Sequence, residues 1–354
     1  MSSRVSAPNN FDTLRLLLAA TVAVYHQAVL SRRPELAFLR SPAAADFAVK
    51  GFFVVSGFLV TQSLRQSRSL GSYFEKRARR LLPGYVAVVL LGFVAGACLT
   101  SWPLAEFLSA PDTWRHLLWN ALFLNYKAMT LPGVFQGPDH PFFAVNGSLW
   151  TIKVEVAFYI LLPLILLAVR RVGLWPVAVA LYVGGVAWRY GMTEMSTGPD
   201  GARYAGLATH LPGQLAYFAC GIVAQMVNPS RKGLLQAGAV ALGVLLLTGP
   251  VGRALAEPAL YAALVLGLAL HLPYLGNASR FGDFSYGLYL IHFPLLQSMI
   301  ALGMLKDATL LPTLTFAVLL AAGAWLSWTL VEKPFLRRKP RGAPSVAAAS
   351  NVAA

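Results

Sequence analysis

The sequence predicts an all-α, polytopic membrane protein of about ten transmembrane helices, with both termini in the cytoplasm. Three observations lead to this class. First, the 354 residues are 57% hydrophobic and only 12% charged, a composition too apolar for a soluble domain. Second, apolar segments of roughly 20 residues, the length that crosses a bilayer as a helix, recur along the whole chain. Third, Lys and Arg are distributed unequally between alternate loops.

The apolar segments define the predicted spans in order. Ten can be drawn, at residues 11–30, 47–64, 83–100, 148–169, 173–190, 210–227, 234–250, 256–272, 284–303 and 309–331. A shorter apolar piece, 114–125, is flanked by aromatic and basic side chains, and we expect it to lie at the interface or to be re-entrant. The first segment could also be a cleaved secretory signal, but no small-residue cleavage pattern follows it.

The spans divide the chain into three regions. We expect an N-terminal tail at 1–10, one transmembrane domain at 11–338 and a C-terminal tail at 339–354. The last tail lacks aromatic and bulky branched side chains, which predicts disorder. The segment 101–147 is the largest predicted outside loop and the only extramembrane region large enough to shape a binding site.

The basic charge of the chain indicates membrane topology rather than nucleic-acid binding. The formal net charge is +15. With the N-terminus inside, the cytoplasmic segments carry 17 Lys and Arg residues and the outside segments carry nine. This asymmetry is the positive-inside signature, and it predicts cytoplasmic termini and some attraction to anionic membrane lipids. Cys98 and Cys220 lie in apolar segments, so no disulfide is expected.

The first span carries ionisable residues, which are expensive in lipid. Arg15 and His26 are eleven residues apart, which at 100° per residue leaves them within about 20° of one helix face. The rise per residue separates them by roughly 16 Å along the axis. Arg15 then lies near the cytoplasmic end and His26 nearer the outside. A snorkelling arginine and a hydrogen-bonded core histidine would also fit this pair.

Two further spans add ionisable groups at a similar depth. The fourth begins "NGSLWTIKVEVAFY", in which Glu155 lies seven residues after Ser148, and the ninth contains His292 in "FSYGLYLIHFP". A carboxylate close to a neutral imidazole would orient it and raise its basicity. We therefore expect His26, Glu155 and His292 to line one polar cavity. The alternative is that Lys153 and Glu155 neutralise each other, although i,i+2 residues do not face one another on a helix.

A cluster of cations stands on the cytoplasmic side, before the third span. The stretch "YFEKRARRLLP" contains Lys76, Arg77, Arg79 and Arg80. Such clusters usually mark topology and lipid headgroups, but arginine forks can equally clamp phosphates. The preceding span contains Ser56 in "GFFVVSGFLV", where small residues allow close helix packing. A role for Ser56 in the site is a weaker inference.

Six motifs occur in order along residues 9–338. They are a basic-x10-His pair (Arg15, His26), a serine-glycine helix (Ser56), R-x-x-R-[LI]-x-P (Arg77, Arg80, Pro83), "SLWTxxxExxFY" (Ser148, Trp150, Glu155, Tyr159), "SYGLYLIHFP" (His292) and "VEKPF" (Glu332). In this combination the chain resembles the acyltransferase-3 family of bacterial integral-membrane acyltransferases, which O-acetylate sugars on surface polysaccharides. It departs from the family at "DTLRL", where many members have DGLRG, and at Lys153.

The resemblance implies a membrane-embedded O-acyltransferase of the bacterial inner membrane. The expected donor is cytoplasmic acyl-CoA, usually acetyl-CoA, and the expected acceptor is a hydroxyl of a sugar or glycolipid on the other side. No metal and no permanently bound cofactor are expected. The resemblance also implies that His26 is the general base, assisted by Glu155, and that the donor phosphates rest near Arg15 and the cationic cluster. Further residues expected to bind donor or acceptor are Lys76, Arg77, Arg80, Ser56, Ser148, Trp150, Tyr159 and His292.

Several alternatives stay open. Direct transfer and a covalent acyl intermediate both fit the family, and the acceptor could be lipopolysaccharide, exopolysaccharide, a nodulation-type oligosaccharide, peptidoglycan or a small glycosylated metabolite. The main alternative class is a secondary transporter or channel, which also has ionisable residues in its spans. That class predicts unwound helices in paired halves, and the sequence has no such internal symmetry. The H-x4-D and G-x-S-x-G motifs of two other enzyme classes are absent.

Overall fold

The computed structural model describes residues 9–276, 282–306 and 310–336, and all regular structure in these ranges is helical. This confirms the all-α class. Within these ranges, six helical segments are long and apolar enough to cross a membrane, so the protein is a multi-pass membrane protein. They are α1 (Phe11–Ser31), α2 (Pro42–Arg65), α3 (Leu70–Leu99), Gly147–Val172, which contains α6 (Trp150–Val172), α11 (Pro250–His271) and Leu311–Leu336.

The other four predicted spans also fall on helices. These are α7 (Leu174–Met195), α9 (Leu211–Val227), α10 (Arg231–Leu247) and α12 (Phe284–Ala301). Their role as spans, the total of ten and the orientation of the termini stay predictions. The two predicted tails lie almost wholly outside the described residues, which begin at Asn9 and end at Leu336.

The third helix begins thirteen residues earlier than the predicted span at 83–100. Ser69 is its N-cap, and its hydroxyl accepts a hydrogen bond from the backbone N–H of Ser72 at 3.1 Å. This cap satisfies one of the free donors of the first turn, so α3 starts at Leu70 and carries the cationic cluster within its own first turns. Pro83, where the predicted span began, lies inside the helix.

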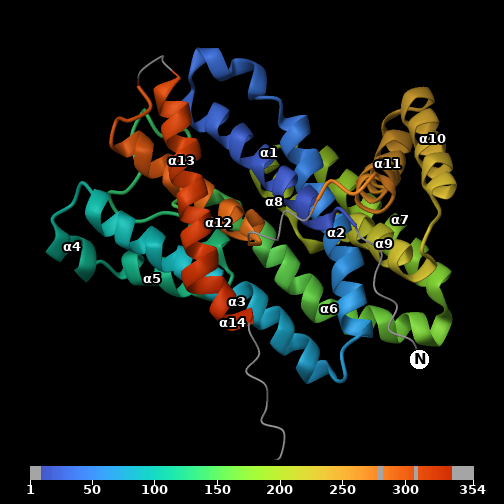
Figure 1. Cartoon of the computed structure of the whole chain (residues 1–354). Coiled ribbons are helices and arrows are strands. Elements are labelled where there is room, and N and C mark those ends of the chain that lie inside the picture. Colours follow the sequence, from blue (N-terminus) through green and yellow to red (C-terminus); the bar gives the residue numbers. More distant parts are fainter. Residues whose placement is uncertain (1–8, 277–281, 307–309, 337–354) are drawn as a thin grey trace, which may run out of the picture.

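The segment between α3 and α6 forms no span. It contains α4 (Leu104–Ser109), α5 (Pro111–Ala121) and the short 3₁₀ turn Asn125–Lys127. α5 lies beside α3 (Figure 1), where the hydroxyl of Tyr85 donates to the carbonyl of Asn120 at 2.7 Å. None of the residues 101–147 lines either of the two cavities described below. The loop therefore has no part in these two cavities, and a binding role for it stays a prediction.

Close helix contacts in the interior depend on glycines. α2 and α9 pack so tightly that a Cβ atom on Gly221 would lie 2.2 Å from the carbonyl oxygen of Val54, and one on Gly57 would lie 2.4 Å from that of Phe218. No larger residue fits without moving a backbone. Around this contact lies a buried apolar core to which α1, α2, α3, α6, α9, α11 and α12 contribute.

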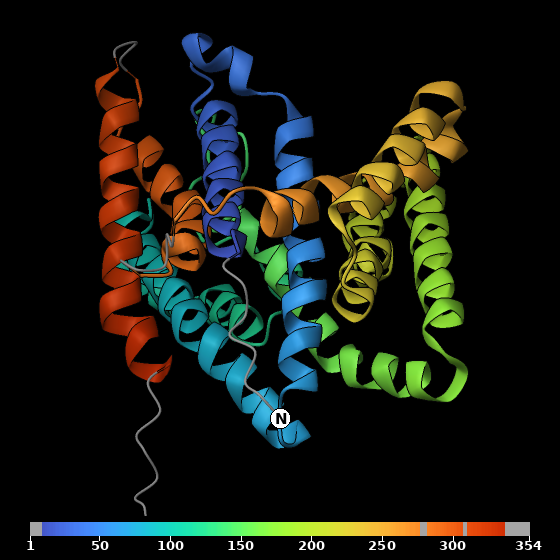
Figure 2. The same ribbon diagram turned by 45° about the vertical axis from the view of Figure 1, so that its right-hand side comes forward.

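Two groups of helices lie on opposite sides of α1. α12 and α13 (Leu311–Leu326) lie on the side of α1 away from α7, α10 and α11, as both Figure 1 and Figure 2 show. α13 continues into a π-helical turn, Ser327–Glu332, and a last helical turn, α14 (Lys333–Leu336). The π turn lies close to Gly282, where a Cβ atom would meet the Trp328 ring at 2.5 Å. The short helix α8 (Gly201–Thr209) joins α7 to α9.

Candidate active site

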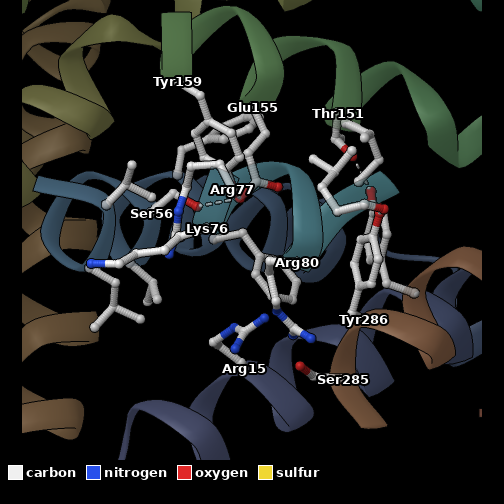
Figure 3. Close-up of a pocket in the computed structure, with 18 of the residues that line it drawn as sticks. Arg15, Ser56, Lys76, Arg77, Arg80, Thr151, Glu155, Tyr159, Ser285 and Tyr286 are labelled. Carbon is white, nitrogen blue, oxygen red and sulfur yellow. Dashed lines mark hydrogen bonds between the residues drawn. The ribbon is translucent and has the colours of Figure 1, made fainter. Parts of the chain in front are cut away.

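A cavity of about 510 Å³ opens among α1, α2, α3, α6 and α12 (Figure 3). Its lining contains five cationic side chains and a single carboxylate, that of Glu155. The cations are Arg15, Lys76, Arg77, Arg79 and Arg80. Such an excess of positive charge in a concave, partly buried site favours an anionic ligand. We call this the cationic cavity.

The structure brings seven of the predicted site residues to this cavity. These are Arg15, Ser56, Lys76, Arg77, Arg80, Glu155 and Tyr159. Four others, His26, Ser148, Trp150 and His292, do not line it. The predicted polar cavity of His26, Glu155 and His292 is therefore divided, because Glu155 lines the cationic cavity and the two histidines do not.

Arg77 has capacity for a ligand. Its Nη2 donates to the hydroxyl of Ser63 at 3.2 Å, and its guanidinium lies 5.7 Å from the centre of the Tyr159 ring. Its Nε is buried and has no hydrogen-bond partner. A buried donor without a partner costs free energy, and an anionic oxygen in the cavity would satisfy it. Lys76 donates to Ser67 at 3.0 Å and lies beside Arg77 in Figure 3.

A network of ion pairs closes one end of the cationic cavity. Asp283, directly before α12, accepts hydrogen bonds from Arg15 at 2.9 Å and from Arg80 at 2.6 Å. Arg80 also pairs at 3.2 Å with Glu332 of the π turn, whose side chain is only 1% exposed. Burial alone would raise the pKa of Asp283, but the two guanidinium groups more than offset this and hold it well below its ordinary value. The carboxylate thus fixes two arginines in place.

Asp283 was not among the site residues predicted from the sequence. A signal for it was present, because it is the only acidic residue in the predicted inner loop 273–283. On that side of the membrane it had several arginines as potential partners. Glu332 was noted only as part of a motif, and its contact with Arg80 spans 252 residues of sequence.

Glu155 has partners other than His26. Its Oε1 accepts a hydrogen bond from Ser56 at 3.2 Å and another from the hydroxyl of Tyr159, one turn away on α6. The predicted direct contact between Glu155 and His26 is not seen. Nor does Lys153 pair with Glu155: its Nζ lies 3.2 Å from His210 Nε2 and 4.5 Å from the centre of the Tyr126 ring. The i,i+2 spacing turns the two side chains to different faces of α6.

His26 contacts His292 instead. The Nδ1 atom of His26 lies 3.0 Å from Nε2 of His292, and the rings are nearly parallel with centres 5.1 Å apart. His292 is fully buried, and its Nδ1 lies 2.7 Å from the carbonyl oxygen of Tyr289. A carbonyl only accepts, so His292 Nδ1 carries the proton and, in the neutral ring, its Nε2 is an acceptor. His26 Nδ1–H must then donate to it, which leaves His26 Nε2 with a free lone pair.

Tyr289 connects the histidine pair with the cationic cavity. Its ring lines the cavity, while its carbonyl oxygen is the one that holds His292. Its hydroxyl lies 2.8 Å from the hydroxyl of Thr151, which in turn donates to the carbonyl of Ser148 at 3.1 Å. Ser148 itself donates to Asn146 at 2.7 Å. In the structure Ser148 therefore supports the start of α6, and it lies one hydrogen bond away from the cavity wall.

Two further observations concern the surroundings of the site. Trp150 packs against the apolar core, with its ring 6.4 Å from that of Phe53. Within the described ranges, no group of three or more His, Cys, Asp or Glu side chains is placed to hold a metal ion. The site thus offers the imidazole of His26, which has a free lone pair, and a cationic cavity at Arg15, roughly 16 Å away along the same helix.

Comparison with known proteins identifies the family of the chain. A family model described as an acyltransferase domain matches residues 9–332. The chain belongs to this acyltransferase family. The family membership accords with a cationic cavity at one end of α1 and a free imidazole nitrogen towards the other.

Three relatives carry related names. Nodulation protein 10 of Rhizobium leguminosarum bv. viciae is 27% identical over 382 residues, covering 93% of this acyltransferase and 93% of the relative. The acyltransferase MdmB of Streptomyces mycarofaciens is 25% identical over 391 residues, covering 97% and 95%. An O-acetyl transferase of Shigella phage Sf6 is 34% identical over 161 residues, covering 43% and 44%. No solved structure matches the chain.

Proposed function

We propose that this acyltransferase moves an acetyl or similarly short acyl group from cytoplasmic acyl-CoA to a hydroxyl of a sugar or glycolipid. The observation that carries the proposal is the cationic cavity, whose five cations suit the phosphates of CoA. The buried, unpartnered Nε of Arg77 provides a donor for one of their oxygens. The name of the phage relative, O-acetyl transferase, supports acetyl as the group transferred.

The donor would enter with its phosphates at Arg15, Arg77 and Arg80, with Lys76 and Arg79 nearby. The pantetheine arm would then extend along α1, whose rise of roughly 16 Å separates Arg15 from His26. The thioester would pass Tyr289 to reach the histidine pair. Glu155 belongs to this path as the one negative charge of the cavity lining. In this proposal Glu155 assists through its charge and through its hydrogen bonds to Ser56 and Tyr159, not by direct contact with the base.

His26 would act as the general base. Its free Nε2 takes the proton of the acceptor hydroxyl as that oxygen attacks the thioester carbonyl carbon. The new C–O bond forms, the C–S bond breaks, and the imidazolium returns its proton to the departing thiolate. His292 would stabilise the imidazolium by accepting a hydrogen bond from its Nδ1–H. The proposed location is the bacterial inner membrane, with both termini in the cytoplasm. A reporter fused after Arg341 tests the side of the C-terminus, because it should be active in the cytoplasm.

The experiment compares wild-type protein and His26→Ala in lipid nanodiscs and in cells. The variant should lose acyl transfer, measured as the mass of one acyl group added to surface glycans, because the base is gone. It should retain CoA affinity, because the phosphate contacts lie at the other end of α1. Wild-type turnover by a correctly folded His26→Ala protein would remove the proposed base. A protein that binds no CoA at all would instead favour the transporter class.

A further inference from the structure

A second cavity lies on the opposite flank of the core from α12 and α13. Its volume is about 430 Å³, and α7, α9, α10 and α11 line it. These helices form the right-hand part of the molecule in Figure 1 and Figure 2. None of the predicted site residues lines it, and the mechanism proposed above does not use it. We call it the tyrosine cavity, after Tyr190, Tyr217 and Tyr261 in its lining.

The tyrosine cavity lies at the same end of the helical body as His26. Glu257 lines it and forms an ion pair with Lys50, eight residues after the start of α2. His26 lies five residues before the end of α1. Because a short connection joins the end of α1 to the start of α2, these two residues stand at similar depths. Ser56, which lines the cationic cavity, lies further along α2, towards the opposite end.

The charges of the tyrosine cavity are balanced. Its lining contains two arginines, Arg189 and Arg253, and two glutamates, Glu194 and Glu257. Arg189 also lies 3.4 Å from Asp46, and Glu257 is paired with Lys50. The lining of the cationic cavity has five cations against one carboxylate. Asp283, Glu332 and Glu75, which lie outside that lining, pair with Arg15, Arg80 and Arg79. Lys76 and Arg77 form no ion pair with a described residue, so two cations of this cavity stay uncompensated. An anionic ligand would therefore favour the cationic cavity, whereas the tyrosine cavity suits a neutral ligand with many hydrogen-bonding groups.

Tyr217 provides a specific sign of a missing partner. The residue is only 1% exposed, and its hydroxyl has no hydrogen-bond partner in the described part of the chain. A buried hydroxyl without a partner lowers stability unless a ligand satisfies it. Two more tyrosines, Tyr190 and Tyr261, give the cavity further aromatic surface with polar tips. Aromatic surface combined with paired acidic and basic groups matches a sugar ring, which has an apolar C–H face and hydroxyls at its edge.

We infer that the tyrosine cavity binds a neutral saccharide unit of the acceptor, at a distance from the hydroxyl that is acylated. This inference rests on the proposed function, because it assigns a place to the acceptor that the proposed transfer requires. An oligosaccharide held there by one unit would present another unit to His26 at the same end of the helical body. The site would thus select acceptors by length as well as by composition.

The test measures equilibrium binding of chitotetraose and maltotetraose to the full chain in nanodiscs, without acyl-CoA. Inorganic phosphate and glycerol 1-phosphate serve as separate anionic probes, the latter as a lipid headgroup. Tyr217→Phe removes only the unpartnered hydroxyl. It should bind the preferred oligosaccharide about 3- to 10-fold more weakly, the effect of one neutral hydrogen bond, and its thermal midpoint should be equal or higher. Ala254 is half-buried in the cavity wall. The larger side chain of Ala254→Phe would occupy part of the cavity, so this variant should bind the oligosaccharide more weakly still.

Tyr85→Phe is the matched control. Its hydroxyl donates to Asn120 outside both cavities, so this variant should lose thermal stability and keep oligosaccharide affinity. The inference is overturned if neither oligosaccharide binds saturably, if affinity is the same in Tyr217→Phe, or if only the anionic probes compete at this site. These binding measurements contain no acyl-CoA, so their results do not depend on whether His26→Ala abolishes acyl transfer.

Discussion

Replacing His292 tests how the base is oriented. In the structure its Nε2 accepts from His26 Nδ1–H at 3.0 Å, and its own Nδ1–H donates to Tyr289 at 2.7 Å. His292→Leu removes the acceptor and leaves His26 free to place its proton on either nitrogen. His292→Gln keeps a carbonyl oxygen that can reach the position of Nε2. Both variants therefore lack the second imidazole, but only His292→Gln keeps an acceptor for the hydrogen bond that orients His26.

The expected loss follows from the charge that develops on His26. In the proposed mechanism His26 takes the acceptor proton, so its Nδ1–H becomes part of an imidazolium, and hydrogen bonds to charged groups are worth about 1.5–3 kcal/mol. His292→Leu should therefore lower turnover roughly 10- to 150-fold. His292→Gln should recover a large part of this loss. CoA affinity should be unchanged in both, because neither variant touches the cationic cavity.

The assay is single-turnover acyl transfer by purified protein in nanodiscs, with thermal unfolding measured on the same samples. His116→Leu is the control, since His116 is also a buried histidine, 3% exposed, but lies on α5 outside the site. Burial lowers the pKa of His116 to about 4, so it too is neutral at pH 7. Equal turnover of the Gln and Leu variants, or a loss matched by His116→Leu, would refute the orienting role and leave His292 as a packing residue.

Three further predictions concern the donor end and the fold. Arg77→Gln should weaken CoA binding, measured by titration calorimetry, about 10- to 150-fold, as expected for the loss of one charged contact. The control Arg115→Gln, which changes an exposed arginine, should not weaken it. If the two variants bind CoA equally well, Arg77 contacts lipid headgroups and not the donor. Asp283→Asn should lower the free energy of unfolding at pH 7 by about 3 kcal/mol. Because the folded pKa of Asp283 is depressed, its contribution is complete above about pH 4 and is lost as the pH falls further, so wild type and variant should converge in acid; a constant gap would contradict this. Gly221→Ala should lower the free energy of unfolding by about 1–3 kcal/mol. Gly267→Ala, where the added Cβ faces open space, should leave it unchanged. Equal thermal unfolding midpoints for the two variants would contradict this prediction.

Local patterns in the sequence predicted which cations lie close together. The eleven-residue spacing of Arg15 and His26 fixes their common face, because helix geometry alone determines it. The cations of α3 were expected near Arg15 from topology, and Arg80 shares Asp283 with it. These predictions needed only the period of a helix and the side of the membrane. The start of α3 was missed because Ser69 caps a first turn that is too polar to count as part of a span.

Contacts between distant spans could not be obtained in this way. Similar depth suggested that Glu155 and His26 meet, but depth does not fix the direction in which a side chain points around its helix. Glu155 turns to Ser56, 99 residues away, and His26 to His292, 266 residues away. Those directions depend on how α2, α6 and α12 pack, which in turn depends on contacts such as that of Gly57 with α9.

Tyr289 also affects how easily protons leak across the membrane through this protein. A cavity of about 510 Å³ with a charged lining fills with water when no ligand is bound, and chains of water conduct protons. Tyr289 lines the cavity, its hydroxyl contacts Thr151, and its ring centre lies 5.6 Å from that of His292, so we expect the ring to separate that water from the two imidazoles. Each charge that crosses dissipates about 2.3 kcal/mol per 100 mV of membrane potential. An opening such as Tyr289→Ala should therefore make vesicles leak protons, a defect that a dye for internal pH would report even with no substrate present.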